Sequence, residues 1–349
     1  QDSSSAASDV YKRQIIGGTI LLCCVLIFHS LSTIVSSKLL DGVNKGELVF
    51  EVEKGDTLSD IIDDLQNNEL ISNPLILFFY GRFTSSQLLK VGDYLVTEDD
   101  SFATLLRKIR KGDVINYAIT FIEGWTFEQW LDHFSSNTHF RNFDVSDVDA
   151  LLDRTGFDKS DPEGWFFPDT YYYTSTSKPS DILKTAFLKM KRILKNTWNS
   201  RNFDLSLKSD YDLLILASII EKETGFAGEQ RLISAVFNNR LKLGMRLQTD
   251  PTVIYGLGES FDGNLTKRHL KHKTPYNTYR IDGLPPTPIC MPSEKSILAA
   301  VNPEHNEALY FVAKGDGTHE FSNNLEDHQR AVKEYQIFNR KKEYKTSPN

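Results

Sequence analysis

Apolar residues are unevenly distributed along this chain, and the longest apolar run lies near its start. Ile15–Val35 contains no Asp, Glu, Lys or Arg. As a helix, a run of this length would span roughly 30 Å, which is about the hydrocarbon thickness of a bilayer. A cleaved signal peptide, the alternative, has a shorter apolar region that ends in a small-residue cleavage site. This run lacks that site, so it predicts one transmembrane helix, and residues 1–14 before it are expected to be disordered or non-native.

Between residues 48 and 114 the apolar positions alternate between strand and helix periods. Leu48–Val52 predicts a strand, and apolar residues at i, i+3, i+4 and i+7 from Leu58 to Leu65 predict a helix capped by Thr57. A second helix, a second strand and a third helix follow, so the predicted order is β-α-α-β-α. The G-D-T-L sequence and its apolar frame resemble a LysM-like module, a small α/β fold that holds N-acetyl sugar chains. A spacer that binds nothing is the alternative.

Residues 115–340 predict a larger domain in which helices alternate with short strands and loops. Amphipathic helices are expected at Ser180–Trp198 and Glu229–Leu243, on either side of a uniformly apolar helix that begins near Tyr211. Leu309–Ala313, a Gly-containing turn and a returning strand predict a hairpin before a last helix. The predicted fold class is therefore α+β, with a transmembrane helix at 15–35, a LysM-like subdomain at 48–114 and a mixed α+β catalytic domain.

Composition excludes some functions. The chain has 349 residues, a net charge of −7 at pH 7 and a pI of about 5.7. Nucleic acid is disfavoured as a ligand because phosphate recognition needs clustered Lys and Arg. The three cysteines, Cys23, Cys24 and Cys290, form no CxxC motif. The sequence also contains no HExxH motif and no Gly-rich phosphate loop, so neither a metal nor a cofactor is expected, and His319 and His328 are interpreted as structural.

Two carboxylates stand at the end of the uniformly apolar helix, in the sequence YDLLILASIIEKETG. Glu221 and Glu223 are two residues apart, which places them roughly 200° apart around a helix, so they cannot share one site. Glu221 lies over Ala217 and Ser218, whose small side chains leave room for a cleft. An apolar surrounding favours the protonated form that a general acid needs. Solvated charges at a helix end are the alternative, and spacing alone favours that alternative.

Several long motifs occur in one order: ASIIEKET, MRLQTDPTVIYGLG, TPYNTYRIDGLPPTPI and YFVAKGDGTHEFS. They are similar to those of the endolytic murein transglycosylase (YceG-like) family, and the similarity extends over nearly the whole chain after residue 14. The resemblance implies that Glu221 is the catalytic acid/base and that Gln248, Tyr276 and Asn277 line the substrate cleft. One departure is Thr287, where the family usually has Gly.

The resemblance implies a membrane-anchored enzyme of peptidoglycan metabolism. It would cleave the β-1,4 bond between MurNAc and GlcNAc within nascent glycan strands and leave 1,6-anhydro-MurNAc ends, thereby terminating or releasing strands. Its expected partners are the glycan strands and cell-wall synthases (penicillin-binding proteins). Lys12 and Arg13 precede the apolar run, which favours a cytoplasmic N-terminus and a catalytic domain on the outer, periplasmic side of the inner membrane.

Two other functions remain open at this stage. A hydrolytic muramidase would use water as the acceptor and would leave reducing ends. A non-catalytic peptidoglycan-binding scaffold, built on the LysM-like block, would lose little when Glu221 is replaced by Gln.

Overall fold

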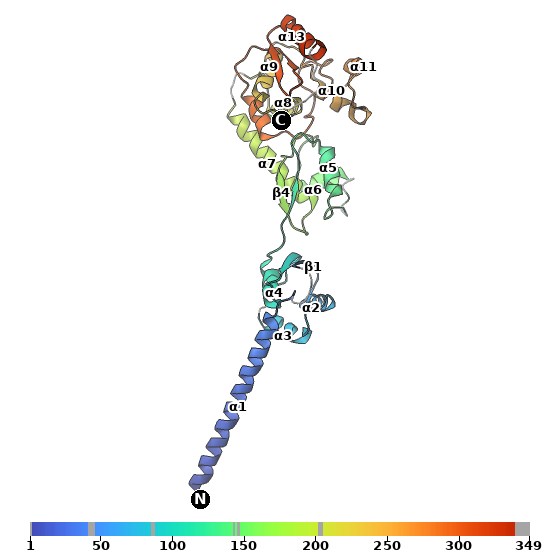
Figure 1. Cartoon of the computed structure of the whole chain (residues 1–349). Coiled ribbons are helices and arrows are strands. Elements are labelled where there is room, and N and C mark those ends of the chain that lie inside the picture. Colours follow the sequence, from blue (N-terminus) through green and yellow to red (C-terminus); the bar gives the residue numbers. More distant parts are fainter. Residues whose placement is uncertain are drawn as a thin grey trace. The chain divides into compact units, whose positions relative to one another are not determined.

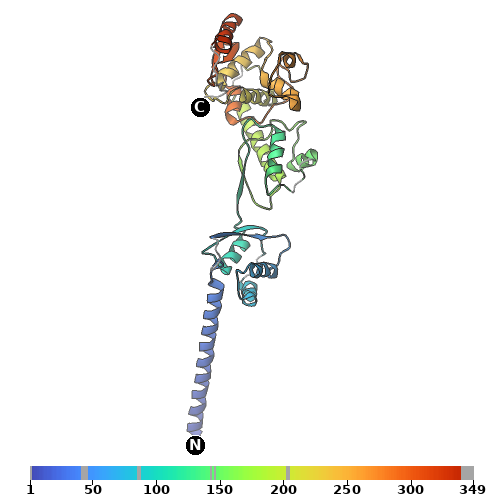
Figure 2. The same ribbon diagram turned by 45° about the vertical axis from the view of Figure 1, so that its right-hand side comes forward.

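The structure is a computed structural model, drawn as a ribbon in Figures 1 and 2. It describes residues 2–40, 46–84, 88–141, 144, 147–201 and 205–338. Backbone contacts divide the chain into two compact units, and each is described by itself. Unit 1 consists of residues 1–117 and 172–176, and unit 2 consists of residues 118–171 and 177–349.

Unit 1 begins with a long helix, α1 (Asp2–Ser36), drawn in blue in Figure 1. Its part from Lys12 to Ser36 is long and apolar enough to cross a membrane, and no other helix among the described residues is. Side chains from 12 to 33 are all exposed. The helix already begins at Asp2, within the segment expected to be disordered, because extending a helix costs far less free energy than nucleating one.

The rest of unit 1 is one antiparallel strand pair with three helices. In chain order its elements are β1 (Glu47–Val52), α2 (Leu58–Asn67), α3 (Pro74–Thr84), β2 (Gly92–Thr97) and α4 (Phe102–Lys111). The two strands pair along their whole length, with Glu47 opposite Thr97 and Val52 opposite Gly92. The predicted order β-α-α-β-α is therefore confirmed, while the assignment of this block to the LysM class stays a prediction.

Local sequence explains where two of these helices begin. Thr57 and Asp60 form a capping box at the start of α2, and Ser101 and Thr104 form one at the start of α4. In each box the first side chain accepts a hydrogen bond from the third residue of the helix, and that residue's side chain binds back to the cap. The N-terminal amides that a helix leaves unpaired are thus partly satisfied.

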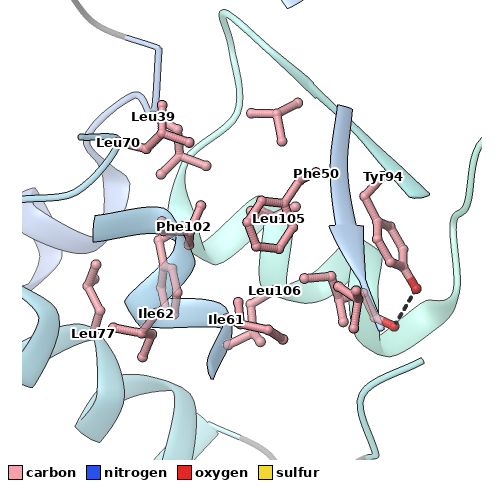
Figure 3. Close-up of a cluster of buried hydrophobic side chains, with 14 of the residues drawn as sticks. Leu39, Phe50, Ile61, Ile62, Leu70, Leu77, Tyr94, Phe102, Leu105 and Leu106 are labelled. Carbon is pink, nitrogen blue, oxygen red and sulfur yellow. Dashed lines mark hydrogen bonds between the residues drawn. The ribbon is translucent and has the colours of Figure 1, made fainter. Parts of the chain in front are cut away.

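The core of unit 1 joins all of its elements (Figure 3). Phe50 of β1 and Tyr94 of β2 face helix residues from α2 and α4, among them Ile61, Leu105 and Leu106. The Tyr94 hydroxyl is inside this core and donates a hydrogen bond to the carbonyl oxygen of Lys90, at 2.7 Å, while the carbonyl oxygen of Ile109 lies 3.3 Å away. A buried phenol therefore has the partner that burial requires.

The C-terminal end of α1 belongs to the same core. Val35 and, just after the helix, Leu39 and Leu40 are buried in it. The Leu39 amide donates to the carbonyl oxygen of Asp100 at 2.9 Å, and Lys38 pairs with Ser101 in an isolated antiparallel bridge. Consequently, the described residues at the end of the apolar helix, up to Leu40, are packed into the folded part of unit 1.

Unit 2 starts with an aromatic-rich layer. Its first helices are α5 (Phe127–Ser136), α6 (Val148–Thr155) and α7 (Pro179–Asn199). Strands β3 (Tyr117–Thr120) and β4 (Thr170–Tyr173) pair with each other, and the unit boundary divides both of them. Phe121 stacks on Trp130 with ring centroids 3.8 Å apart, and Phe166 contacts both Trp130 and Phe187. The aromatic side chains of Trp165, Phe166 and Phe167 are thus buried in the core of unit 2.

The remaining elements of unit 2 surround one buried helix. They are α8 (Asp210–Glu223), α9 (Gln230–Lys242), α10 (Asp250–Leu257), η1 (Gly258–Ser260), α11 (Lys267–Lys271), α12 (Glu294–Val301), β5 (Tyr310–Ala313), β6 (His319–Ser322), α13 (Leu325–Val332) and η2 (Lys333–Phe338). Helix α8 packs against α7, α9, α10 and α12. Because it is covered on every side, it is apolar all around rather than along one stripe.

The C-terminal hairpin follows the predicted pattern. Strands β5 and β6 pair antiparallel, with Tyr310 opposite Ser322 and Ala313 opposite His319. The last predicted helix is present as α13, which continues into the π-helical segment η2. With three two-stranded sheets and many helices among the described residues, the chain has the mixed α+β architecture that the sequence predicted.

Candidate active site

The end of α8 brings two carboxylates out of the core of unit 2. Residues Leu213–Ile220 are all buried, and Glu221 and Glu223 are the first partly exposed acidic side chains after them. The helix ends at Glu223, and Thr224 is the C-cap residue, with an extended backbone. The two carboxylates point to different surroundings, as their helical spacing predicted.

Glu221 faces the start of α12. Its Oε2 accepts hydrogen bonds from the backbone amide of Ser293, at 2.9 Å, and from the Ser293 hydroxyl, at 2.5 Å. Ser293 is the N-cap residue of α12, so the carboxylate lies where the amide groups of a helix start favour negative charge. These contacts join α8 to α12, and they occupy one of the two oxygens of Glu221.

The turn at residues 123–126 lies against this face of α8. The Lys222 ammonium donates to the carbonyl oxygen of Gly124 at 3.3 Å, and the Gly124 amide donates to the carbonyl oxygen of Met291 at 2.8 Å. Burial and, second, the negative charge of Glu221 raise the pKa of Glu123, while Lys295 opposes the shift. A second carboxylate is therefore close to Glu221, a pairing that no sequence motif indicated.

Glu223 faces the opposite side of α8. Its Oε1 accepts a hydrogen bond from the Thr249 hydroxyl. Burial raises the pKa of Glu223 to about 7, and the nearby Asp250 acts in the same direction, against the effects of the Thr249 bond and of Arg240. A carboxyl group with this pKa exists in both protonation states near neutral pH, which is what a group that first donates and then accepts a proton requires.

Glu223 also lines a cavity of about 560 Å³ in unit 2. The cavity lies between the end of α8, helix α9, the loop before α10, the β5–β6 hairpin and α13. Its polar lining includes Glu223, Arg240, Gln248, Asp250, Tyr279 and His328. The volume falls within the range of small-molecule binding sites, and a few convergent polar groups inside such a cavity are typical of an active site.

Several of these polar groups are held by the backbone around the cavity. Arg240 donates from Nε to the carbonyl oxygen of Leu309, at 2.6 Å, and from Nη1 to that of Leu247, at 2.8 Å. The Tyr279 hydroxyl donates to Asp250 Oδ1 at 2.7 Å. Side chains fixed in this way keep their positions without a ligand, which lowers the entropy cost of binding one.

Gln248, predicted to line the substrate cleft, lies in the Glu223 cavity. Its side chain is exposed, and its Oε1 is 3.4 Å from Arg240 Nη1. Its backbone φ is 51°, in the left-handed region, which costs a residue other than Gly about 1–2 kcal/mol. Backbone strain of this kind is concentrated at functional sites, so the conformation of Gln248 supports the choice of this cavity.

Tyr276, the second predicted substrate residue, is not among the residues that line this cavity. Its hydroxyl lies 2.8 Å from the Thr287 hydroxyl, and its ring is 4.9 Å from that of Tyr255. Thr287 is the position where the family usually has Gly, so the departure seen in the sequence supplies the partner of Tyr276. Contact between Tyr276 and a substrate stays a prediction.

Asn277, the third predicted substrate residue, is completely buried. Its Nδ2 donates to backbone carbonyl oxygens at the end of α11, including that of His272 at 2.5 Å, and its Oδ1 accepts from the Tyr279 amide at 3.0 Å. These bonds hold the loop that carries Tyr279 to the cavity. A direct substrate contact for Asn277 stays a prediction, and any such contact would compete with these bonds.

Two histidines at the cavity were interpreted as structural. His319 Nδ1 lies 2.7 Å from Glu229 Oε2, and the His319 amide donates to the other oxygen of Glu229 at 3.0 Å. His328 stacks on Tyr310 with ring centroids 5.1 Å apart. Burial and the charge of Arg240 lower the pKa of His328, so its ring is neutral near pH 7. His319 is thus bound within the protein, whereas His328 contributes an uncharged ring to the wall.

The model of the YceG-like family matches residues 50–334 of this chain, which is most of its length. The chain belongs to the YceG-like family. This family is the one that the sequence motifs resemble, and the matched residues include parts of both units.

Named relatives of this YceG-like chain carry the name of an enzyme. The chain is 28% identical to the endolytic murein transglycosylase of Bacillus subtilis strain 168, over 84% of this chain and 86% of that protein. It is 26% identical to the protein of the same name from Streptococcus pneumoniae D39, over 85% of this chain but only 60% of that protein. A crystal structure of a yceG-like protein from Listeria monocytogenes is 29% identical and superposes with a TM-score of 0.52, over 82% of this chain and 99% of the other.

A second buried carboxylate in the YceG-like chain shows that a raised pKa alone does not mark an acid catalyst. Burial raises the pKa of Glu163 to about 7. Its oxygens accept hydrogen bonds from the Phe127 amide, at the start of α5, and from the Tyr255 hydroxyl at 3.1 Å. Glu163 is 4% exposed and does not line the cavity, so it caps α5 inside the protein. Glu223 differs because it combines a raised pKa with access to a cavity.

Sequence reasoning did not single out Glu223 and Arg240, which line the cavity. Glu223 was set aside because one helix cannot place two carboxylates in one site, and the neighbours at positions 217 and 218 favoured Glu221. The helical spacing correctly placed the two carboxylates on different sides of α8. Which of these sides faces a cavity depends on β5, α13 and the loop before α10, which are distant in sequence. For Arg240, the sequence showed only that it lies near the end of a predicted amphipathic helix, which does not indicate a site residue.

Proposed function

We propose that this chain is a membrane-anchored lytic transglycosylase that cuts peptidoglycan glycan strands internally, at the β-1,4 bond between MurNAc and GlcNAc. The names of its relatives support the reaction class. The observation that carries the proposal is a carboxyl group with a pKa of about 7, Glu223, on the wall of a cavity of about 560 Å³. Such a group is suited to protonate a glycosidic oxygen in a bound sugar.

The sequence predicted Glu221 as the catalytic acid/base, and the geometry favours Glu223. Glu221 accepts hydrogen bonds from both donors of Ser293, which hold one of its oxygens at the start of α12. Glu223 shares its cavity with Gln248, the one predicted substrate residue whose side chain is exposed there. We therefore propose Glu223 for the proton transfers and retain Glu221 as the alternative that the experiments below test.

In the proposed mechanism one carboxyl group serves twice. Protonated Glu223 gives its proton to the glycosidic oxygen, the bond from that oxygen to C1 of MurNAc breaks, and positive charge develops on the sugar ring. Ionised Glu223 then takes the proton of the MurNAc 6-hydroxyl, whose oxygen bonds to C1. The products are a free GlcNAc 4-hydroxyl and a 1,6-anhydro-MurNAc end, without added water, and Glu223 is protonated again.

This route needs only one carboxylate, because the nucleophile belongs to the substrate. Ordinary glycosidases use two carboxyl groups, one of which holds a water or attacks the sugar. Within the proposed site, Arg240 and Gln248 supply hydrogen-bond donors and Asp250 an acceptor for sugar hydroxyl and N-acetyl groups. Their fixed positions would orient the 6-hydroxyl toward C1, and orientation is a large part of the rate in such a ring closure.

Helix α1 is proposed as the membrane anchor, with the N-terminus in the cytoplasm and unit 2 on the outer side of the inner membrane. The apolar stretch at Lys12–Ser36 and the basic pair at its start support this topology. In this position the enzyme would act on strands as they leave cell-wall synthases, the proposed partners. The β-α-α-β-α block of unit 1 is proposed as a LysM-like module that holds the glycan.

The reaction class is tested by incubating the full-length protein in detergent with uncross-linked glycan strands and analysing the products by mass spectrometry. A transglycosylase gives fragments that end in 1,6-anhydro-MurNAc, and a Glu223→Gln variant gives none. Reducing ends, heavier by one water, would replace the proposal with a hydrolytic muramidase. Intact strands that remain bound to both proteins would replace it with a peptidoglycan-binding scaffold.

A further inference from the structure

Helix α3 of unit 1 carries an uncovered row of large apolar side chains. Leu75, Phe79 and Phe83 are four residues apart, so they lie on one side of the helix. They are 74%, 56% and 83% exposed, and the rings of Phe79 and Phe83 stack at 6.4 Å. A soluble surface rarely leaves a continuous apolar row of this kind open to water, so the row indicates an interaction surface.

The opposite side of α3 is already packed, which fixes the direction of the row. Leu77 and Gly81 are buried against the core of unit 1. A Cβ atom placed on Gly81 would lie 2.7 Å from the side chain of Leu58, which shows how closely α2 and α3 approach each other. Helix α3 therefore cannot rotate to bury its apolar row in its own unit without breaking these contacts.

The row lies beside the helix proposed to cross the membrane. Helix α3 packs against α1 (Figure 1). Ile34 of α1 and Phe78 of α3 lie against the same core. The apolar stretch Lys12–Ser36 has 25 residues, which at about 1.5 Å per residue gives roughly 37 Å, more than the roughly 30 Å of a hydrocarbon core. The last turns of α1, where α3 is attached, therefore fall at the level of the lipid headgroups.

We propose that α3 is an interfacial membrane-binding helix, whose row of Leu75, Phe79 and Phe83 inserts into the outer lipid surface next to α1. This inference rests on the membrane anchoring proposed above. A bilayer is the occupant that the position of α3 favours, because α1 would hold the row at the lipid boundary. Arg82, exposed beside Phe83, can reach lipid phosphates while the aromatic rings enter the acyl region.

A second membrane contact would change what the anchor does. A single transmembrane helix leaves an attached domain free to rotate and tilt, whereas two contacts at different points define its orientation. Because the end of α1 is built into the core of unit 1, insertion of α3 would hold that core as one body against the bilayer. The β-α-α-β-α block would then present one constant face to glycan strands near the membrane.

The test places a fluorescent label on α3 in the full-length protein reconstituted into liposomes. Cys23 and Cys24 are replaced by Ser, and Cys290 is completely buried and does not compete for the label. The environment-sensitive label is attached at Phe83→Cys, with Lys54→Cys as an exposed polar control in unit 1 and Val25→Cys as a probe of the anchor. Lipids that carry a nitroxide at the headgroup or deep in the acyl chain quench labels at matching depths.

The proposal expects the label at Phe83→Cys to lose about half of its emission or more with shallow nitroxides, and the label at Lys54→Cys to lose little. The label at Val25→Cys should be quenched by the deep nitroxide. Quenching at Val25→Cys without quenching at Phe83→Cys would overturn the inference and leave the anchor intact. Self-quenching between labels at Phe83→Cys in place of lipid quenching would instead assign the row to a second copy. No quenching at either position would overturn the anchoring and the inference together.

Discussion

At the scale of single residues, α8 shows how two carboxylates of one helix acquire different chemistry. Glu221 accepts hydrogen bonds from the amide and hydroxyl of Ser293, at the start of α12. Glu223 accepts one from the Thr249 hydroxyl, and burial raises its pKa to about 7. The two side chains therefore differ in their partners and surroundings, and this difference is the basis of the proposal that Glu223 is the acid.

Buried carboxyl groups should make the stability of the protein fall as pH rises from about 4.5 to 7. Burial raises the folded-state pKa of Glu163 to about 7, whereas an unfolded Glu titrates near ~4.3. Between these values the folded chain holds a proton that the unfolded chain has lost, so deprotonation lowers the free energy of unfolding, by roughly 1–3 kcal/mol.

Thermal unfolding midpoints at about pH 5 and about pH 8 check this expectation. The wild type should melt at a lower temperature at the higher pH. A Glu163→Gln variant should show a smaller decrease, because its amide does not titrate. An equal or larger decrease in the variant would contradict the assignment of the proton to Glu163.

The contact between Tyr276 and Thr287 allows the predicted substrate role of Tyr276 to be separated from its structural one. Removing either hydroxyl, by Tyr276→Phe or Thr287→Ala, should lower the free energy of unfolding by about 0.5–1.5 kcal/mol, and the double variant by less than the sum. If Tyr276 also binds substrate, Tyr276→Phe should raise KM more than Thr287→Ala does. Equal kinetic effects would assign Tyr276 to the loop alone.

At the scale of elements, local pattern was sufficient for most helices and strands. Capping residues such as Thr57 and the apolar spacing of α2 are local signals, and the structure follows them. The uniformly apolar stretch of α8 indicated a buried helix, which it is. What the sequence could not give is the wall of the cavity, because Arg240, Tyr279 and His328 come from three separate segments that only the fold brings together.

The loop before α10 is the element whose conformation is most directly tied to the site. Gln248 has φ of 51°, which Gly adopts without strain. A Gln248→Gly variant should therefore keep the stability of the wild type or gain up to about 1 kcal/mol, and it should lose about tenfold or more in kcat/KM because the side chain is absent. The measurements are chemical unfolding and initial rates of strand cleavage.

A Gln248→Asn variant is the matched control for that prediction. Asn tolerates the left-handed backbone and keeps an amide, so it should retain more activity than Gly while being similarly stable. A Gly variant that is both fully active and no less stable would show that the side chain of Gln248 has no part in the reaction.

At the scale of the whole molecule, the order of the parts followed from the sequence, and the roles proposed for them draw on the structure as well. The apolar run, the β-α-α-β-α block and the larger α+β domain follow one another along the chain in the predicted order. Backbone contacts divide them into two compact units. The close attachment of α1 to the core of unit 1, through Leu39 and Lys38, was not predicted from the sequence. It turns the proposed anchor into part of a folded body.

The central claim is that Glu223, in the cavity of unit 2, transfers the protons of the reaction. The most direct test is the rate of anhydro-end formation by the wild type, Glu223→Gln and Glu221→Gln, measured across about pH 5 to 9. The account predicts a loss of about 10²–10⁴-fold for Glu223→Gln. It predicts that Glu221→Gln loses less than about tenfold in this rate, because its amide oxygen still accepts a hydrogen bond from Ser293.

The pH profile of the wild type is part of the same measurement. Its kcat/KM should fall as pH rises through about 7, where the acid deprotonates. Full activity in Glu223→Gln together with inactive Glu221→Gln would contradict the account and return the catalytic role to Glu221.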